Sequence, residues 1–270
     1  MESFCDRLGK EFIVTGEYEP GSDVSREFLT KAGKFKGHVD ALNSIDSPLG
    51  IPQISAAVAS YLVQEELGIE PIMQICARDR NKTCIINDLL GAKLLGINHM
   101  LCIAGDYSDK CKPVYELDSA RFAKLVAEEM PRKYKGFEMK VGVGYNPMVR
   151  PQEPQNIALE KKMQYADFIQ TQPIYDFSLL ENETAEKFKE KMMVGVLPLL
   201  NKKMGDYFNK SVPGFDIDPS LLAGIRTPDD GIDQVRSMIK EIKKAGFGGI
   251  HLMVFEIEDR IGEILEGVKG

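Results

Sequence analysis

Short apolar runs alternate with amphipathic stretches along almost the whole chain. A run of about four to eight apolar residues between turn signals is typical of a buried strand, whereas apolar residues at a spacing of three and four indicate one face of a helix. The predicted strands are residues 12–18, 38–42, 70–76, 100–104, 137–144, 168–172, 193–197 and 249–254. The predicted helices are residues 24–35, 54–67, 85–95, 117–129, 157–165, 177–191, 203–209, 232–245 and 259–268.

Eight strands, each followed by helical sequence, predict an α/β fold with a parallel sheet and helical crossovers. The 270 residues give about 34 per repeat, which is the length of one strand–helix unit. We therefore expect a single (β/α)8 TIM barrel over residues 1–270, with an open doubly wound sheet as the alternative. Residues 210–230, rich in Pro, Gly and Asp, are expected to form an ordered loop over the barrel.

Charge and composition narrow the classes of partner. The net charge of −7 argues against a nucleic-acid surface, and no apolar run is long enough to predict a membrane span. The first residues lack the basic and apolar regions of a secretory signal, and the five cysteines suggest no disulfide framework, so we expect a cytoplasmic protein. The three histidines lie far apart in sequence, and we expect no metal site.

Polar residues follow the apolar strand runs at one end of the predicted barrel. Catalytic residues of such barrels lie at the carboxyl ends of the strands and in the loops that follow. Six strands end in this way, at Glu17, Asn43, Gln74, Asp106, Asn146 and Gln172. One polar residue after a strand means little, but six around one rim predict a polar pocket.

Two carboxylates in this set are candidates for acid–base chemistry. Glu17 ends an otherwise apolar strand, and removal of water there would favour the protonated form that a general acid needs. Asp106 follows Gly105, and a glycine allows close approach of a planar ligand. The alternatives are an ion pair with a loop for Glu17 and a turn or helix cap for Asp106.

No glycine-rich nucleotide fingerprint and no hydrolase triad is apparent, but a series of short motifs is. The motifs, in order, are Gly16-Glu17-Tyr18-Glu19-Pro20, Asp40-Ala41-Leu42-Asn43, residues 76–81 (CARDRN), Ala104-Gly105-Asp106, Asn146-Pro147, residues 166–172 (ADFIQTQ), residues 212–215 (VPGF) and residues 249–252 (GIHL). Through these motifs, taken together, the chain resembles the methylenetetrahydrofolate reductase family over residues 12–265.

The resemblance implies a (β/α)8 barrel that binds flavin, FAD rather than FMN, and reduces the methylene bridge of 5,10-methylenetetrahydrofolate to a methyl group. It implies that Glu17 is the acid that opens the folate ring, that Asp106 lies beside flavin and pterin, and that Gln172 binds the pterin. The positions that it implies for the cofactor are Asn43, Gln74, Gly105, Asp106, Tyr115, Asn146, Arg150 and Lys161.

Several positions depart from the family pattern. Ala104 replaces the arginine that many members have before Gly-Asp, and Lys202 stands where an aromatic residue packs on the substrate. These changes predict that nicotinamide nucleotides are poor electron donors and that a partner redox protein supplies the electrons. Two other functions stay open: a pterin-binding methyltransferase barrel and a noncatalytic flavin- or pterin-binding subunit of a redox complex. A homo-oligomer is also open.

Overall fold

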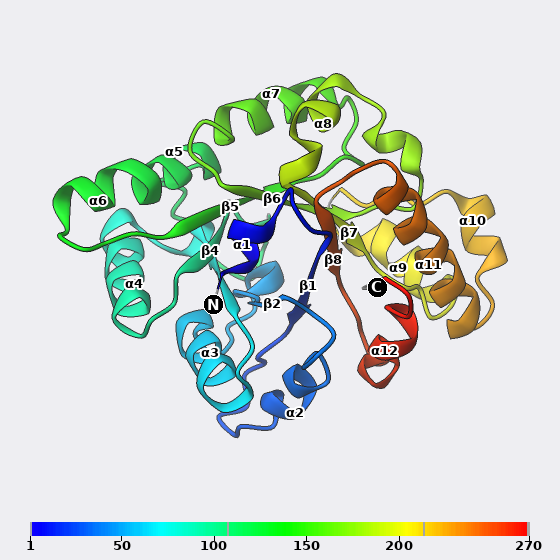
Figure 1. Ribbon diagram of the computed structural model, residues 1–270, viewed down its shortest axis with the longest axis horizontal. Helices are drawn as coiled ribbons and strands as arrows, with labels where there is room; N and C mark the ends of the chain where they lie inside the picture. Colours follow the sequence, from blue (N-terminus) through cyan, green and yellow to red (C-terminus); the bar gives the residue numbers. More distant parts are fainter. Residues whose placement is uncertain (1, 107, 213, 269–270) are drawn as a thin grey trace.

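The computed structural model describes residues 2–106, 108–212 and 214–268. Eight parallel strands pair in sequence order, and β8 pairs with β1, so that the sheet closes into a barrel. Helices surround it (Figure 1). The closed sheet confirms the predicted (β/α)8 barrel and excludes the open doubly wound sheet.

The elements follow one another as strand and helix. The strands are β1 (Ile13–Tyr18), β2 (Ala41–Ser44), β3 (Pro71–Cys76), β4 (His99–Ile103), β5 (Lys140–Tyr145), β6 (Phe168–Pro173), β7 (Met192–Val196) and β8 (Gly249–Leu252). The helices are α1 (Phe4–Arg7), α2 (Phe28–Gly33), α3 (Ala56–Leu62), α4 (Lys82–Leu94), α5 (Ser119–Lys124), α6 (Met130–Lys133), α7 (Glu153–Lys162), α8 (Glu183–Phe188), α9 (Lys202–Ser211), α10 (Pro219–Gly224), α11 (Pro228–Lys244) and α12 (Ile261–Ile264).

Two predicted elements near the N-terminus have wrong boundaries. The strand expected at 38–42 begins only at Ala41, because Gly37 has a φ of 82° and the His38 amide donates to the Phe35 carbonyl in a turn. The helix expected at 24–35 begins only at Phe28. Upstream, the Ser25 amide donates to the Asp23 carboxylate at 2.8 Å, a local bond that competes with helix formation.

Three predictions in the second half also need correction. The expected loop at 210–230 contains α10, because Asp218 caps its first turn and Pro219 occupies its first position. The helix expected at 177–191 is broken, since Asn182 caps a separate α8. The last strand ends at Leu252 rather than at residue 254.

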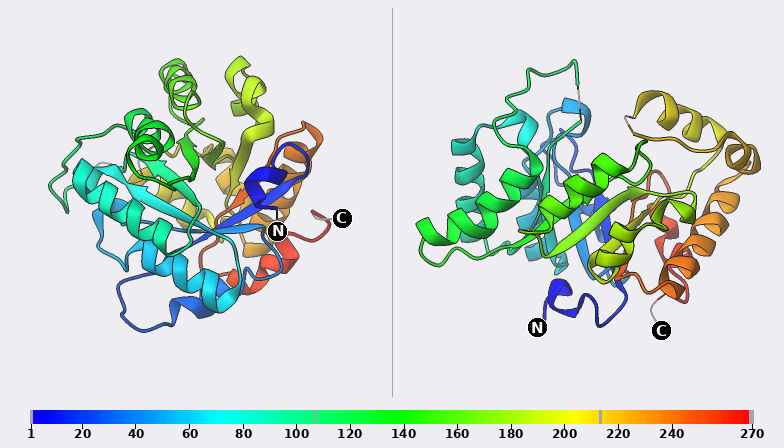
Figure 2. Two further views of the ribbon diagram at one scale, coloured as in Figure 1. Left: turned by 60° about the vertical axis from the view of Figure 1, so that its left-hand side comes forward. Right: turned by 90° about the horizontal axis from the view of Figure 1, so that it is seen from above.

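The lower half of the barrel interior is apolar and is closed by α1. Alternate residues of a strand point to opposite faces, and the inward positions nearest the strand starts form one cluster. That cluster contains Phe4, Ile13, Ala41, Ile72, Leu101, Phe168 and Met193. Phe4 comes from α1, and its ring lies 5.3 Å from that of Phe168. Figure 2 shows α1 under one end of the barrel and α10 with the loop after β4 at the other.

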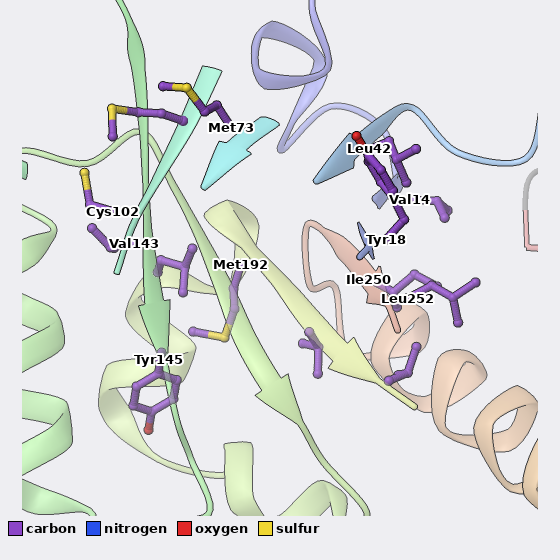
Figure 3. Packing of buried hydrophobic residues seen from close by; sticks show 14 of the residues in the cluster. Val14, Tyr18, Leu42, Met73, Cys102, Val143, Tyr145, Met192, Ile250 and Leu252 are labelled. Atoms are coloured by element: carbon purple, nitrogen blue, oxygen red, sulfur yellow. The ribbon is translucent and has the colours of Figure 1, made fainter. Parts of the chain in front are cut away.

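The outward positions of the strands form the larger core against the helices. Figure 3 shows side chains of this core and labels Val14, Tyr18, Leu42, Met73, Cys102, Val143, Tyr145, Met192, Ile250 and Leu252. Because both faces of each strand are covered, the strand sequences are almost continuously apolar. Among the described helices, none is long and apolar enough to cross a membrane.

A buried histidine under the barrel makes stability depend on pH. His99 packs against the ring of Phe4 at 4.9 Å, and burial lowers the pKa of His99 from 6.5 to about 4. Between those values the unfolded chain binds the proton and the folded chain does not, so stability falls as the pH drops. At about 1.4 kcal/mol per unit, the loss attributable to His99 is about 3 kcal/mol between pH 6.5 and 4.

Urea unfolding at several pH values checks this expectation with His99→Gln. The variant should lose less stability than the wild type between pH 6.5 and 4, while His38→Gln, at an exposed turn position, should behave like the wild type. The same pH dependence in the wild type and in His99→Gln would contradict it.

Candidate functional site

The inward positions of the strands change from apolar to polar toward the carboxyl ends. On β1, Ile13 is followed at inward positions by Thr15 and Glu17. The same change occurs at Asn43 on β2, Gln74 on β3, Gln170 on β6 and His251 on β8. These six side chains are linked by hydrogen bonds inside the barrel. The structure therefore brings Glu17, Asn43 and Gln74 of the predicted set together.

One oxygen of the Glu17 carboxyl is held and the other is not. The Gln74 amide donates to Glu17 Oε2 at 3.4 Å, and His251 Nε2 lies 3.1 Å from the same atom. Among the described residues, no hydrogen bond to Glu17 Oε1 is found. The side chain is 18% exposed, so the carboxyl faces the mouth with one oxygen fixed and one available to a ligand.

The tautomer of His251 follows from its neighbours. His251 is 2% exposed, and its Nδ1 lies 2.9 Å from Thr15 Oγ1. The Thr15 hydroxyl also lies 3.3 Å from the Ile250 carbonyl, and Gln170 Nε2 lies 3.3 Å from Nδ1. With Nδ1 as the acceptor of these donors, the ring proton is on Nε2 and is donated to Glu17. Thr15 and His251 are adjacent in the register of β1 and β8, which brings these two side chains together.

His251, Thr15 and Gln170 were not predicted as site residues. Each is a single polar residue within an apolar strand, where a satisfied core position is the ordinary interpretation. The available signal was the period of two, because Thr15 shares a strand face with Glu17, and Gln170 shares one with Gln172.

Asn43 and Gln170 form an amide pair across the interior. Asn43 Nδ2 donates to Gln170 Oε1 at 2.7 Å, and Gln170 Nε2 donates to Asn43 Oδ1 at 3.1 Å. Asn43 is fully buried, so both of its polar atoms are engaged within the protein. Gln170 also contacts Thr15 and His251, so the pair is connected to Glu17 through His251.

Asp106 and Gln172 lie at the mouth and are exposed. Protein atoms that displace water raise the pKa of the Asp106 carboxyl, and the charge of Arg78 opposes that rise. Among the described residues, no side-chain hydrogen bond of Asp106 is found. Gln172 is the residue before the end of β6, in the segment where the register with β7 shifts between Gln170 and Pro173. Both lie at or just after the carboxyl end of a strand, as Glu17 does on β1.

Gly105 has a clear structural role. Its φ is +89°, and a Cβ there would lie 2.2 Å from Cys76 Sγ and 2.8 Å from Arg78 Cβ. Any side chain would be strained and would clash. The space that a side chain at Gly105 would fill is therefore occupied by Cys76 and Arg78.

Of the other predicted cofactor positions, Tyr115, Asn146 and Arg150 lie in loops that follow strands, whereas Lys161 lies in the last turn of α7, which leads back to the start of β6. Tyr115 is 50% exposed, with a φ of 46°. Asn146 joins two loops by donating to the Gly214 carbonyl at 3.3 Å. Arg150 is exposed in the loop after β5, and Lys161 is exposed on α7.

The neighbouring Lys162, rather than Lys161, points inward from α7. Lys162 is 8% exposed, and its ammonium donates to the Gly144 carbonyl on β5. Burial lowers the pKa of Lys162 to about 8, and no carboxylate pairs with it among the described residues. A buried cation without a counter-ion costs stability and is typical of a functional position.

Comparison with known proteins adds to this geometry. The family model described as methylenetetrahydrofolate reductase matches residues 50–269. The chain belongs to this family. No curated protein matches the chain. A solved structure of YKL-39 in the presence of chitooligosaccharides superimposes with a TM-score of 0.52 and 12% sequence identity, over 94% of this chain and 95% of that one. At that identity the likeness shows a shared barrel fold alone.

The family match covers part of the pocket. Gln74, Asp106, Gln172 and His251 lie within the matched residues, whereas Glu17 precedes them. The barrel closure connects the two regions, because β1 pairs with β8 and His251 contacts Glu17 directly. The matched range therefore contains His251, Gln170 and Gln74, whereas Glu17, Thr15 and Asn43 come from the strands that precede it.

Proposed function

We propose that this chain is a flavin-dependent oxidoreductase that reduces 5,10-methylenetetrahydrofolate, or a related pterin one-carbon carrier, to the 5-methyl form. The observation that carries the proposal is the Glu17 carboxyl. It lies at the mouth of a family barrel with Oε2 fixed by two neighbours and Oε1 available.

The reaction needs an acid at this position. The methylene carbon becomes an acceptor for hydride only after a ring nitrogen is protonated and the five-membered ring opens to an iminium ion. A protonated Glu17 would donate from Oε1, the oxygen without a partner among the described residues. Such proton transfer contributes about 10²–10⁴-fold to a rate.

His251 and Thr15 would keep Glu17 in this orientation. Because His251 Nε2–H donates to Oε2, the carboxyl cannot rotate freely, and the proton to be transferred is directed to Oε1. Thr15 and Gln170 fix the imidazole from its other side. All three are nearly fully buried, so this support does not depend on solvent.

Asp106 and Gln172 would act on the substrate from the rim. An ionised Asp106 attracts the cationic iminium, and Arg78 favours that ionised form by its charge. The Gln172 amide can both donate to and accept from the edge of a pterin. Both side chains are exposed, in agreement with a role toward a bound ligand.

The residues beside β5 fit a flavin. Gly142 and Gly144 face the interior; the space at Gly142 is filled by Phe168, whereas a Cβ at Gly144 would meet no atom within 4 Å. This leaves room for a flat ring next to the strand that accepts from Lys162. When bound, FAD would supply the hydride. Lys162 would hold an electronegative group of it, and Tyr115, Asn146, Arg150 and Lys161 are further candidate contacts.

Anaerobic reconstitution tests the proposal. The chain is incubated with FAD, reduced with dithionite and mixed with methylenetetrahydrofolate. We expect a yellow complex that is bleached by reduction and regains its colour with the folate. A chain that binds neither flavin nor folate would contradict the proposal. A chain that binds them without reoxidation would be a binding subunit.

We further propose that NADH and NADPH reduce this flavin slowly and that a redox protein is the electron donor. Lys202, at the position of the family's aromatic residue, begins α9 and pairs with Asp206 at 2.7 Å. Aromatic stacking adds roughly 0.5–1.5 kcal/mol beyond burial, so Lys202→Phe should accelerate flavin reduction by NADH by roughly 2- to 10-fold.

Stopped-flow mixing of the reconstituted chain with each nucleotide measures these rates. Lys203→Phe, one position further along the exposed start of α9, is the matched control and should leave the rate unchanged. Fast bleaching of the wild type by either nucleotide would refute the redox-protein proposal. That outcome would assign the aromatic role to the group formed by Tyr207, Phe208 and Phe255.

A further inference from the structure

One buried guanidinium joins three loops at the mouth of the barrel. Arg78 follows β3 and its side chain is 1% exposed. Its Nη1 donates to the Asp106 carbonyl at 2.9 Å, and its Nη2 donates to the Ser47 carbonyl at 2.9 Å. Nε and Nη2 also donate to the two oxygens of the Asp79 carboxylate, at 2.8 and 2.6 Å. The loops after β2, β3 and β4 thus meet at a single side chain.

The main chain of Arg78 reinforces these contacts. Its amide donates to the Ala104 carbonyl at 2.9 Å, and its carbonyl accepts from the Val114 amide at 2.7 Å. The segment from Ala104 to Val114, which contains Asp106, is therefore tied to Arg78 at three points.

The loops that Arg78 holds have unfavourable backbone conformations. Ser47 and Leu49, after β2, have φ values of 48° and 51°, and Tyr115, after β4, has a φ of 46°. A left-handed residue other than glycine costs about 1–3 kcal/mol and persists only where its surroundings fix it. Without the guanidinium, both loops would be free to relax, and the carboxyl of Asp106 would move with its main chain.

Only an arginine side chain fits this position. Its planar fork carries five N–H donors in a fixed arrangement, and all three of its nitrogens donate here, to groups of three residues. Lysine would keep the charge but not the geometry. Asp79 balances the charge and leaves Nη1 directed at Asp106.

We propose that Arg78 is a positioning residue that sets where the Asp106 carboxylate meets the substrate. This inference rests on the proposed function for the role of Asp106, but the contact itself does not. The side chain that fastens the main chain of Asp106 comes from Arg78, in the turn that follows β3. Asp106 has no side-chain hydrogen bond among the described residues, so its placement depends on its main chain.

Kinetics of Arg78→Ala and Arg78→Lys test the proposal. In both, reoxidation of the reduced flavin by methylenetetrahydrofolate should slow by about 10- to 100-fold, since a displacement of about 1 Å can cost that much. Free guanidinium at millimolar concentration should restore part of the rate to Arg78→Ala, whereas tetramethylammonium should not. Arg80→Ala is the matched control. Arg80 pairs with Asp46 and Asp88 and does not touch Asp106, so the rate should fall less than about 3-fold.

A second measurement needs no turnover and no flavin. The Asp106 carboxyl is titrated by carbon NMR, with Asp106→Asn to assign its signal. In Arg78→Lys the charge stays but the contact is lost. In Arg78→Gln the charge is lost as well, and the pKa of Asp106 should rise further above its usual value. If the wild type is not reoxidised by the folate, the proposed function fails, and this titration still decides on Arg78.

Three results would overturn the inference. The first is a folded Arg78→Ala that is reoxidised at the wild-type rate. The second is a loss of rate of the same size in Arg80→Ala without guanidinium rescue. The third is an Asp106 titration that is the same in the wild type and in Arg78→Gln.

Discussion

Glu17→Gln is expected to slow folate reduction by about 10²–10⁴-fold while flavin reduction continues at its normal rate. Glutamine has the shape of glutamate and can keep the contacts with His251 and Gln74, but it has no acidic proton to donate. Only the half-reaction that needs protonation of the folate should therefore suffer. Stopped-flow spectroscopy of each half-reaction separates the two effects.

Glu19→Gln is the matched control, because Glu19 is an exposed carboxylate just beyond the end of β1 that bonds to Gln53. It should reduce the folate within about 2-fold of the wild-type rate. Glu17→Gln with a near-normal rate of folate reduction would remove Glu17 from the mechanism.

Lys162→Met should make the protein more stable at pH 7. A lowering of the pKa from 10.5 to about 8 corresponds to about 3 kcal/mol, and loss of the bond to Gly144 offsets part of that, so we expect a gain of about 1–3 kcal/mol. The wild type should also gain stability between pH 8 and 10.5. There the folded lysine has released its proton and the unfolded one has not.

The same variant should bind FAD at least about 10-fold more weakly, as expected when a charged hydrogen bond to a ligand is lost. Lys161→Met is the control, because Lys161 is exposed; its stability should stay within about 0.5 kcal/mol of the wild type. Urea unfolding and flavin fluorescence titration measure both quantities. Equal effects of the two substitutions, or a loss of stability in Lys162→Met, would contradict the assignment of Lys162.

The barrel was predictable because each strand has a recognisable local pattern of apolar residues. Runs such as Met100–Ala104 are apolar on both faces, and their spacing by helical sequence leaves few other folds. Boundaries were less predictable where side chains bond to nearby backbone, as at Asp23 and Asn182. Those bonds break helices that the apolar spacing alone would continue.

The candidate site was predictable only in part. Glu17, Gln74 and Asp106 follow apolar runs and so mark the rim. His251 and Gln170 lie within such runs, and their roles depend on which strands become neighbours when the barrel closes.

The inward-pointing basic residues could not be predicted from the sequence, for a different reason. Lys161 and Lys162 lie on a helix without a distinct apolar face, so the sequence does not indicate which of them points inward. The contacts of Arg78 depend on a separate loop in which Ser47 and Leu49 adopt left-handed backbone conformations. Neither residue is a glycine, so the sequence does not indicate these conformations.

Product analysis after a single turnover tests the central claim most directly. The FAD-loaded chain is reduced with dithionite, freed of excess reductant and mixed anaerobically with methylenetetrahydrofolate, and the folates are separated and quantified. The account predicts one 5-methyltetrahydrofolate for each reduced flavin in the wild type and far less in Glu17→Gln over the same time. Reduced flavin that persists in the presence of the folate, with no methyl product, would contradict it.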